Sequence, residues 1–407
     1  MKIISSISGL RATLVEGKFD NLLTYKYISA ICKLFPAGLI IIGRDGRPSG
    51  IEIEKFIAQT LNYFNRDYVL LGLVPTPTVQ LMVEELKAIV GISITASHNP
   101  AEWNGLKFIN SHGIFLNSDE NKKLLGIISE QNITEIPDEI QNTIDIDIAN
   151  KNELVIDTHI NKILKSNIKF DIEKIKEKKF KVVLDAINAS GSFIIPKLLD
   201  ALGCEIIEIN CNGDGEFVHL PEPLPENLLE LAQKVASTNS DLGIAIDPDG
   251  DRLVLINEYG KPIKEELTIV LSVWSYLELS KNPSDVSIVV NHSTTQLVEK
   301  VAEKFGAKVF RSAVGEINVV EKMKEVRAQI GGEGSGGVIL KDFHLGRDAI
   351  AGIVLILSLL ARKGKKISEL IDELPLLIMK KVKLSTAIII ISIIMLLFTL
   401  SCQSSSV

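Results

Sequence analysis

The sequence predicts an α/β protein of several consecutive domains, and three observations support this prediction. Short apolar runs typical of strands alternate with turn residues and with helical patterns. The chain has 407 residues, which is enough for two to four domains with their own cores. Two stretches in which the pattern changes divide it into three parts.

Five strand-like runs each precede a polar or glycine-rich loop. They are Gly38–Ile42 before GRDGRPSG, Val90–Ile94 before TASHNP, Lys181–Leu184 before DAINASG, Leu242–Ile246 before DPDGDR, and Ser287–Val290 before NHSTTQ. Near the end, Ala349–Leu360 is an apolar run typical of a helix, and basic residues follow it. In α/β sheets, ligand-binding groups lie in loops past the carboxyl ends of strands. We therefore expect every motif discussed below to lie in such a loop.

Changes in pattern predict the domain boundaries. Residues 127–160 are acidic and rich in asparagine, with weak periodicity, which places the first boundary there. The second boundary follows Asp251, near the turn at Asn257–Pro262. We expect domains at residues 1–150, 151–257 and 258–375, with a separate apolar tail at residues 376–407.

Composition and charge exclude some classes of function. Apolar residues make up 46% and charged residues 23% of the chain, as in ordinary globular proteins. The net charge of -7 argues against a nucleic-acid partner. No two of the four cysteines have CxxC spacing, so we expect buried or idle thiols in a reducing cytosol. The first 20 residues do not resemble a secretory signal, and we expect a cytoplasmic protein. Nothing in the pattern indicates an oligomeric state.

The tail differs from the rest of the chain. No charged residue occurs from Leu384 to Val407, and the segment that begins at Met379 has a basic region, an apolar region and a small residue before Cys402. This order is typical of a lipoprotein export signal, here at the opposite end of a protein. Our hypothesis is a fused neighbouring reading frame. The alternative is a membrane anchor or buried hairpin, and membrane contact is expected only if the tail is a genuine part of the protein.

The motif TASHNP, Thr95–Pro100, places a hydroxyl beside an imidazole and an amide in a turn. Ser97 is therefore a candidate phosphoryl carrier, which His98 and Asn99 would orient. The alternative is a polar surface loop without a catalytic role.

The motif DPDGDR, Asp247–Arg252, carries three carboxylates at alternating positions in a tight turn. Asp247, Asp249 and Asp251 suit a hard cation such as Mg²⁺, because close carboxylates repel one another without a cation. An EF-hand calcium loop is a weaker alternative, because Arg252 occupies its sixth position, where that loop needs glycine. A plain surface turn is the third possibility.

The stretch GGEGSGG, Gly331–Gly337, contains the pattern G-x-G-x-x-G. A dinucleotide fingerprint should open a helix at once, but the following residues, VILKDFHLGRD, predict a strand and a loop. We reject the dinucleotide interpretation and propose that Glu333 and Ser335 grip sugar hydroxyls. Further short motifs are SGLRAT (Ser8–Thr13), GRDGRPSG (Gly43–Gly50), PTPT (Pro75–Thr78), WNGLKF (Trp103–Phe108), SAVGEINV (Ser312–Val319) and HLGRDA (His344–Ala349).

In combination and in this order, the motifs resemble the α-D-phosphohexomutase family, which includes phosphoglucomutase, phosphomannomutase and phosphoglucosamine mutase. The resemblance covers roughly residues 5–375. It implies α/β domains with mixed sheets around a central active-site cleft. It also implies phosphoryl transfer between the 1- and 6-positions of a hexose phosphate, through a phosphoserine and a hexose bisphosphate.

The resemblance also implies roles for individual residues. Ser97 would be the phosphoserine, and the three aspartates would hold Mg²⁺ together with Ser97. Lys107 and Arg11 would lie beside the reacting phosphate, with Lys107 as a candidate general acid–base and His98 nearby. The implied substrate-binding residues are Glu333, Ser335, Arg252 and Gly315.

Two departures from the family pattern are visible. We call GGEGSGG, Gly331–Gly337, the sugar loop. Many members have a histidine at its end, where this chain has Gly337, and His344 is a candidate substitute. The family also ends in a fourth domain with an R-x-S-G-T-E-P-like loop that grips the second phosphate, and no such loop occurs here. This predicts a chain that lacks the fourth domain. The alternatives to a mutase are a catalytically impaired sugar-phosphate-binding remnant and a phosphatase that transfers the phosphate to water.

Overall fold

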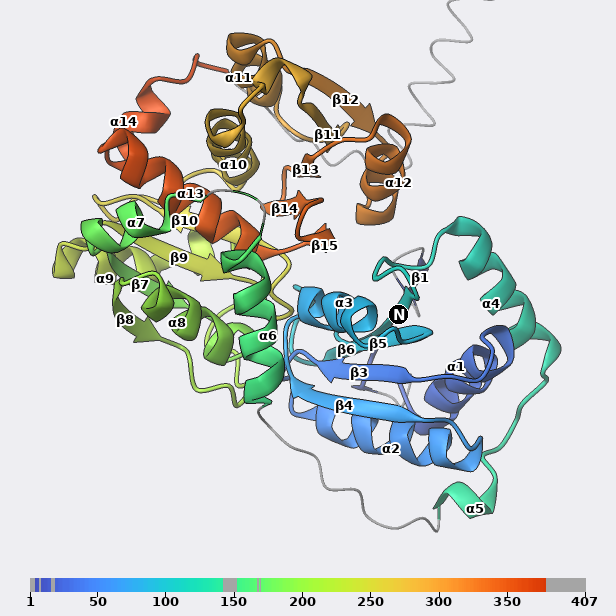
Figure 1. Ribbon diagram of the computed structural model, residues 1–407. Helices are drawn as coiled ribbons and strands as arrows, with labels where there is room; N and C mark the ends of the chain where they lie inside the picture. Colours follow the sequence, from blue (N-terminus) through green and yellow to red (C-terminus); the bar gives the residue numbers. More distant parts are fainter. Residues whose placement is uncertain are drawn as a thin grey trace, which may run out of the picture. The chain divides into compact units, whose positions relative to one another are not determined.

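The computed structural model describes residues 4–6, 9–15, 19–141, 152–166, 168 and 170–377. Residues 1–374 form one compact unit. Within the described residues, the strands form three mixed sheets, each with its own helices (Figure 1). The predicted α/β class is therefore confirmed, whereas most of the tail predicted at 376–407 lies outside the described residues.

The first sheet has six strands in the order β1-β2-β6-β5-β3-β4. Hydrophobic side chains of α1, α2 and α4 form a core with one face of this sheet. The other face meets α3, whose Val79 and Val83 pack where Gly43 and Gly91 leave room. The bounds are β1 (Ile4–Ser6), β2 (Gly9–Thr13), α1 (Asn21–Leu34), β3 (Ile40–Arg44), α2 (Ser49–Tyr63), β4 (Tyr68–Leu73), α3 (Thr76–Glu85), β5 (Val90–Ile94), β6 (Trp103–Asn110), α4 (Ser118–Glu130) and α5 (Asp138–Gln141).

The second sheet has four strands in the order β10-β9-β7-β8. Side chains of α9 pack with β7, β9 and β10 in a core of leucine, isoleucine, valine and alanine. The bounds are α6 (Glu153–Leu164), α7 (Ile172–Lys178), β7 (Lys181–Asp185), α8 (Gly191–Ala201), β8 (Glu205–Ile209), α9 (Leu229–Thr238), β9 (Leu242–Ile246) and β10 (Leu253–Ile256).

The third sheet has five strands in the order β12-β11-β13-β14-β15. Helices α10 and α13 are buried along nearly their whole lengths, which explains why their sequences are almost continuously apolar. The bounds are α10 (Glu266–Leu279), β11 (Ser287–Asn291), α11 (Leu297–Phe305), β12 (Lys308–Ser312), α12 (Glu316–Val326), β13 (Ile330–Glu333), β14 (Gly337–Leu340), β15 (His344–Arg347), α13 (Ala349–Lys363) and α14 (Ile367–Asp372).

The same strand order recurs in all three sheets. In each, three neighbouring parallel strands are followed by an antiparallel strand, giving the series β4-β3-β5-β6, β8-β7-β9-β10 and β12-β11-β13-β14. The connection between the last parallel strand and the antiparallel strand contains TASHNP in the first sheet and DPDGDR in the second. In the third sheet it is the middle of GGEGSGG, residues 334–336, and the ends of that motif lie on β13 and β14. The three chemistry-bearing motifs thus occupy equivalent positions in a repeated topology.

The five predicted strands are all present, but the expectation that every motif lies in a loop is wrong. Arg11 lies on β2 and Lys107 on β6, and Glu333 is the last residue of β13. The reason is the antiparallel pairing: β6 runs back from the edge where β5 ends, so that Lys107 pairs with Ser93 near the carboxyl end of β5. A residue within an antiparallel strand can therefore reach the same edge as a loop.

The first predicted boundary, at residue 150, lies outside the described residues, and the boundary at residue 257 stays a prediction. The stretch 127–160 that looked irregular contains α5 and the start of α6.

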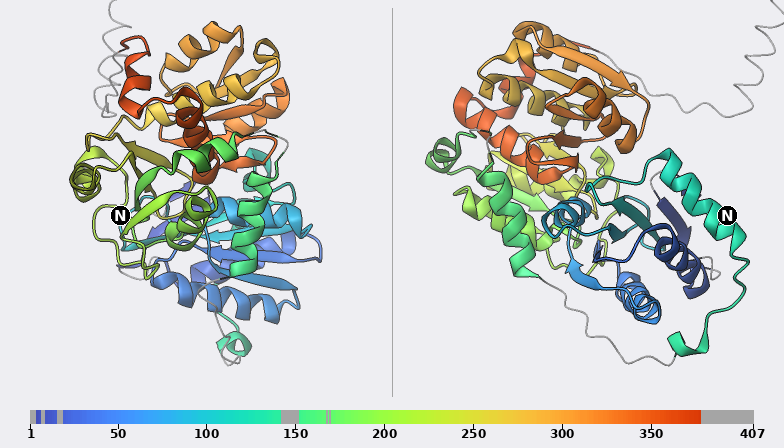
Figure 2. Two further views of the ribbon diagram at one scale, coloured as in Figure 1. Left: turned by 60° about the vertical axis from the view of Figure 1, so that its left-hand side comes forward. Right: turned by 45° about the vertical axis from the view of Figure 1, so that its right-hand side comes forward.

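Among the described residues, no helix combines the length and the apolar character needed to cross a membrane. Figure 2 shows the helices and strands of the three sheets from two further directions.

A buried ion pair lies beneath the loop that follows β3. Arg44, the last residue of β3, donates from Nε to Glu54 of α2 at 3.0 Å, and both side chains are almost fully buried. Burial raises the pKa of Glu54 to about 7, although the charge and hydrogen bond of Arg44 oppose this rise. The folded protein therefore holds a proton on Glu54 more tightly than the unfolded chain does.

We predict that Glu54→Gln flattens the dependence of stability on pH. Because the folded pKa lies above the usual value, the contribution of Glu54 is complete at low pH and is lost as the pH rises from about 4.5 to about 7. Urea denaturation across this range would measure the free energy of unfolding. Glu52→Gln, on the exposed side of the same helix, is the matched control. An unchanged slope in Glu54→Gln would contradict the prediction.

Candidate active site

The loop after β5 holds Ser97 in an unusual conformation. Ser97 is buried and has a φ of 53°, in the left-handed region that a residue with a side chain rarely adopts. Its amide N–H donates to Thr95 Oγ1 at 2.7 Å, and Thr95 Oγ1 in turn donates to Asp45 Oδ2 at 2.6 Å. Such strain persists only where the surroundings hold the backbone in place.

Arg47 supplies much of that support. Its guanidinium is fully buried, and Nε donates to Asp45 Oδ2 at 3.0 Å. The remaining donors reach four main-chain carbonyl oxygens of the Ser97 loop and the start of β6: those of Ser97 at 2.6 Å, Asn99 at 2.7 Å, Pro100 at 2.7 Å and Trp103 at 3.1 Å. A planar guanidinium with five donors suits this task, whereas a lysine does not.

The aspartate loop meets the serine loop directly. Ser97 Oγ lies 3.3 Å from Asp247 Oδ2, although 150 residues separate the two in the chain. Asp247, Asp249 and Asp251 are each at most 1% exposed, and they bring carboxylate oxygens within 4.8 Å of one another. The expected meeting of Ser97 with the aspartate triad is therefore found in the structure.

Neighbouring loops hold the aspartates in place. Thr76, at the start of α3, donates to Asp249 Oδ2 at 2.9 Å. Ser190, from the loop after β7, donates to the carbonyl oxygen of Pro248 at 2.7 Å. Asp247 Oδ1 accepts the amide N–H groups of Asp251 and Arg252, each at 3.1 Å.

The triad concentrates negative charge in a buried place. Burial, together with repulsion from Asp251 and Asp249, raises the pKa of Asp247 well above its usual range. Burial alone would also raise the pKa of Asp249, but the charge and hydrogen bond of Lys107 lower it below the usual range. The three carboxylates thus need positive charge to remain ionised together.

Part of that positive charge comes from Lys107 and Arg11. Lys107 Nζ donates to Asp249 Oδ2 at 2.5 Å and to Asp251 Oδ2 at 3.3 Å. Burial opposes its charge, but the two aspartates raise the pKa of Lys107, so the ammonium is protonated. Arg11 donates to Asn99 Oδ1 at 3.2 Å. Burial lowers the pKa of Arg11, and the charges of Asp249 and Asp251 oppose this shift.

The triad also fits a divalent cation. Asp249 Oδ1 and Asp251 Oδ1 are buried and have no hydrogen-bond partner among the residues that the structure describes. An unpaired carboxylate oxygen in a buried site is costly, and a hard cation is a suitable ligand for it. Asp247, Asp249 and Asp251 are therefore the residues that could hold Mg²⁺.

His98 and Arg252 complete this side of the site. His98 Nδ1 lies 2.9 Å from Arg252 Nη2 and 3.3 Å from Ser97 Oγ. Burial, together with the positive charges of Arg252 and Arg11, lowers the pKa of His98 to about 3. His98 is therefore neutral near pH 7, and its Nδ1 accepts a hydrogen bond from the arginine.

The sugar-loop residues form a second cluster around Glu333. Glu333 Oε1 accepts from Asn291 Nδ2 at 2.6 Å and from the amide N–H of Gly315 at 3.0 Å. Its Oε2 accepts from Arg347 Nη1 at 2.7 Å. The structure therefore brings Gly315 to Glu333, as two residues of one predicted substrate-binding set. Ser335 is half-buried in the loop between β13 and β14.

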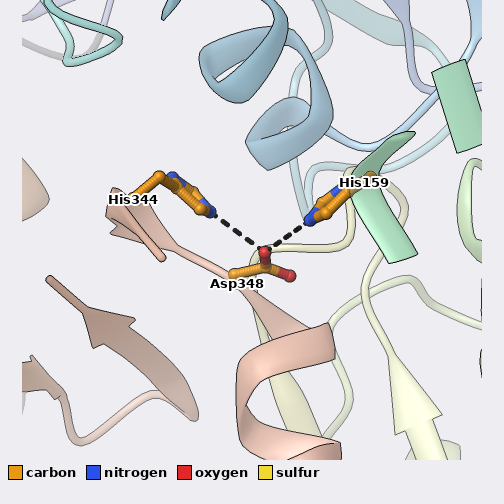
Figure 3. A group of neighbouring side chains, drawn as sticks. All are labelled: His159, His344 and Asp348. Carbon is orange, nitrogen blue, oxygen red and sulfur yellow. Dashed lines mark hydrogen bonds and ion pairs between the residues drawn. The ribbon is translucent and has the colours of Figure 1, made fainter. Parts of the chain in front are cut away.

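His344 does not substitute for the missing histidine of the sugar loop. Its Nε2 lies 3.0 Å from Asp348 Oδ2, and the same oxygen lies 2.9 Å from His159 Nε2 (Figure 3). His159, His344 and Asp348 are residue types that bind metal ions, and their ligand atoms lie within 4.8 Å of one another. However, both imidazoles already hydrogen-bond to the carboxylate. The expectation for His344 is wrong because β15 directs its side chain towards α6 and α13.

Sequence reasoning singled out neither Arg47 nor Arg347 as a site residue. Both lie in motifs that it noted, GRDGRPSG and HLGRDA, but nothing local distinguishes a buried arginine from a solvated one. A possible signal for Arg47 is its place between glycine and proline in a loop directly after a buried strand. For Arg347 no local signal is evident.

Comparisons with known proteins agree with this geometry. Models of the phosphoglucomutase/phosphomannomutase family match the chain in three consecutive parts: α/β/α domain I at residues 3–134, domain II at 157–260 and domain III at 265–377. A phosphoglucomutase/phosphomannomutase of Thermococcus kodakarensis is 36% identical over 345 residues, which are 83% of this chain and 72% of the relative. A phosphoglucosamine mutase of Methanococcus maripaludis is 33% identical over 381 residues, covering 92% and 80%.

A solved structure has the same fold. The crystal structure of a phosphoglucomutase/phosphomannomutase family protein from Burkholderia thailandensis superposes with a TM-score of 0.76 and is 26% identical. The match covers 92% of this chain and 81% of that one.

We predict that Arg47→Lys loosens the Ser97 loop. Lysine keeps the charge but cannot serve the carboxylate and four carbonyl oxygens together, so we expect a loss of about 2–4 kcal/mol in the free energy of unfolding. Hydrogen exchange of the amides in residues 95–100, followed by mass spectrometry, should accelerate. Arg66→Lys is the control, because Arg66 donates to the carbonyl oxygens of Cys32 and Phe35, which belong to α1 and its C-cap rather than to the Ser97 loop. Equal exchange rates in the loop of both variants would rule out the clamp.

We also predict that His98 stays neutral throughout the range in which an ordinary histidine titrates. With its pKa lowered to about 3, its imidazole should not take up a proton between pH 8 and pH 5. NMR of the ring resonances would measure this, with Arg252→Gln as the comparison. Loss of the arginine should raise the pKa of His98. A midpoint near pH 6.5 in the unaltered protein would contradict the predicted environment.

Proposed function

The chain belongs to the phosphoglucomutase/phosphomannomutase family, and from this premise we propose that it moves a phosphoryl group between the 1- and 6-positions of a hexose phosphate. In this proposal Ser97 carries the phosphate, and a hexose bisphosphate is the intermediate. The observation that carries the proposal is the contact between a buried, strained serine and a buried aspartate triad.

Mg²⁺ held by Asp247, Asp249 and Asp251 together with the Ser97 group would supply charge neutralisation for the transferring phosphoryl group. Phosphoserine carries about -1.5 to -2 charges at pH 7. In this site it would lie beside three carboxylates, so the cation and the neighbouring basic residues are needed together. Asp249 Oδ1 and Asp251 Oδ1, which accept no hydrogen bond from the described part of the chain, support this assignment.

The basic residues have separate roles in the proposal. Lys107, protonated and close to Asp249 and Asp251, would donate its proton to the ester oxygen that loses the phosphoryl group, so that this oxygen leaves as a hydroxyl. Arg11 and Arg252 would offset charge on the phosphoryl oxygens, and neutral His98 would hold Arg252 in place. We assign these roles from position and charge.

Glu333 and Ser335 would bind the sugar hydroxyls, and Gly315 would hold Glu333 through its amide N–H. Asn291, the amide N–H of Gly315 and Arg347 already donate to this carboxylate, which leaves about one of its roughly four lone-pair sites, on Oε2, for a sugar hydroxyl. The relatives act on glucose, mannose or glucosamine phosphates by name, and for this chain we propose a hexose phosphate of that group.

We predict that the purified protein carries one phosphate on Ser97 and that Ser97→Ala abolishes both this mass increment and mutase activity. The fall in kcat/KM should be about 10³-fold or more, since a nucleophile is lost. Mass spectrometry and coupled assays with glucose, mannose and glucosamine phosphates would measure both. Ser111→Ala, at an exposed serine, is the control.

The same assay separates the alternatives. Free phosphate in excess of isomer would indicate a phosphatase. A thermal shift with hexose phosphate, without isomer or phosphate release, would indicate a binding protein that has lost activity. Either result would overturn the mutase proposal.

A further inference from the structure

The guanidinium of Arg347 joins the aspartate loop to the sugar loop. From β15, its Nη2 donates to Asp251 Oδ2 at 2.7 Å, its Nη1 to Glu333 Oε2 at 2.7 Å, and its Nε to Glu316 Oε2 at 3.0 Å. One buried cation thus contacts a carboxylate of the triad and the carboxylate at the centre of the sugar loop. Among residues 9–15, 19–140, 152–166, 168 and 170–377, no other basic side chain forms ion pairs with both of these carboxylates.

Gly337 makes this position available. A Cβ atom at residue 337 would lie 2.3 Å from Cδ of Arg347, which is too close for any side chain. The position of the Arg347 side chain therefore depends on the absence of a side chain at residue 337. Any larger residue at 337 would have to displace the aliphatic part of the Arg347 side chain.

The histidine pair fixes the segment that carries Arg347. In the sequence, His344 precedes Arg347 and Asp348 follows it. Asp348 Oδ2 is hydrogen-bonded to Nε2 of both His344 and His159 (Figure 3). His159 is held in turn by Thr78 Oγ1 at 2.7 Å from its Nδ1. Burial alone would raise the pKa of Asp348, but the charge and hydrogen bond of His159 and the contacts of His344 lower it, so the carboxylate is ionised and accepts both.

We propose that Arg347 is a positioning residue that couples cation binding at the aspartate triad to hexose phosphate binding at the sugar loop. By occupying Asp251 Oδ2 it leaves Asp251 Oδ1 for the cation, an oxygen with no hydrogen-bond partner among the described residues and with Arg252 Nε 3.9 Å away. By holding Glu333 Oε2 it orders that carboxylate for a sugar hydroxyl. A ligand that orders one end of this bridge reduces the ordering cost at the other end. The inference rests on the proposed function, because it assumes that both ligands bind here.

The test measures binding rather than turnover. Mn²⁺, a paramagnetic stand-in for Mg²⁺, is titrated by EPR into the full chain with and without glucose 6-phosphate. We expect glucose 6-phosphate to tighten Mn²⁺ binding within the usual range of about 5- to 150-fold. In Arg347→Gln this factor should fall at least about fivefold, with Arg347→Lys intermediate, and Arg66→Gln should leave it unchanged.

A double-mutant cycle separates coupling from simple structural damage. Glu333→Gln should change Mn²⁺ affinity in the unaltered protein but not in the Arg347→Gln background, because the bridge is already lost. Asp348→Ser keeps an oxygen that can cap α13 but cannot reach both imidazoles, so it should also reduce the coupling. If Arg347→Gln does not fold, Arg347→Lys and Glu333→Gln carry the test.

The outcomes distinguish the two proposals. Coupling that survives in Arg347→Gln and in Arg347→Lys overturns the role of Arg347 while leaving the proposed function intact. If the unaltered protein binds neither Mn²⁺ nor glucose 6-phosphate, the proposed function fails, and this inference fails with it. Loss of coupling in the Arg347 variants, with separate binding of each ligand retained, supports the bridge.

Discussion

The central constraint on this molecule is the burial of three aspartates within one turn. Asp247, Asp249 and Asp251 have almost no exposed surface, and their mutual repulsion would push protons onto them unless positive charge lay nearby. The surrounding structure supplies that charge: Lys107 comes from the first sheet and Arg347 from the third. Ion pairs to the aspartate loop of the second sheet therefore link it to both the first and the third sheet.

The repeated topology explains how they can meet. Each sheet ends its run of parallel strands with an antiparallel strand, and the intervening loop emerges at the carboxyl edge. The antiparallel strand returns from the same edge, which places Lys107 beside the loop that precedes it. One arrangement, used three times, therefore presents Ser97, the aspartate triad and Glu333 at equivalent places.

Buried arginines make this arrangement rigid. Arg47 gathers the carbonyl oxygens of the serine loop, and Arg347 holds carboxylates of two loops together. In both cases a planar fork of donors satisfies acceptors that would otherwise be buried without partners. The absence of a side chain at Gly337 leaves room for the side chain of Arg347, ten residues later in the chain.

The sequence by itself determined the α/β class, the five strands before the motif loops, and the chemical types of the site residues. These follow from local periodicity and from motifs such as TASHNP and DPDGDR, which are recognised within a few consecutive residues. Local patterns were less informative for Lys107 and Arg11. Both were expected in loops, but both lie on strands. Antiparallel pairing brings Lys107 on β6 to the edge of the sheet where the Ser97 loop emerges.

Only the tertiary structure decided which charges share a cluster. It placed His344 with His159 and Asp348 instead of in the sugar loop, and it revealed Arg47 and Arg347 as buried residues with several partners. The physical reason is that an ion pair depends on distance in space. Ser97 and Asp247 are 150 residues apart in the chain and 3.3 Å apart in the fold, and no local pattern encodes that separation.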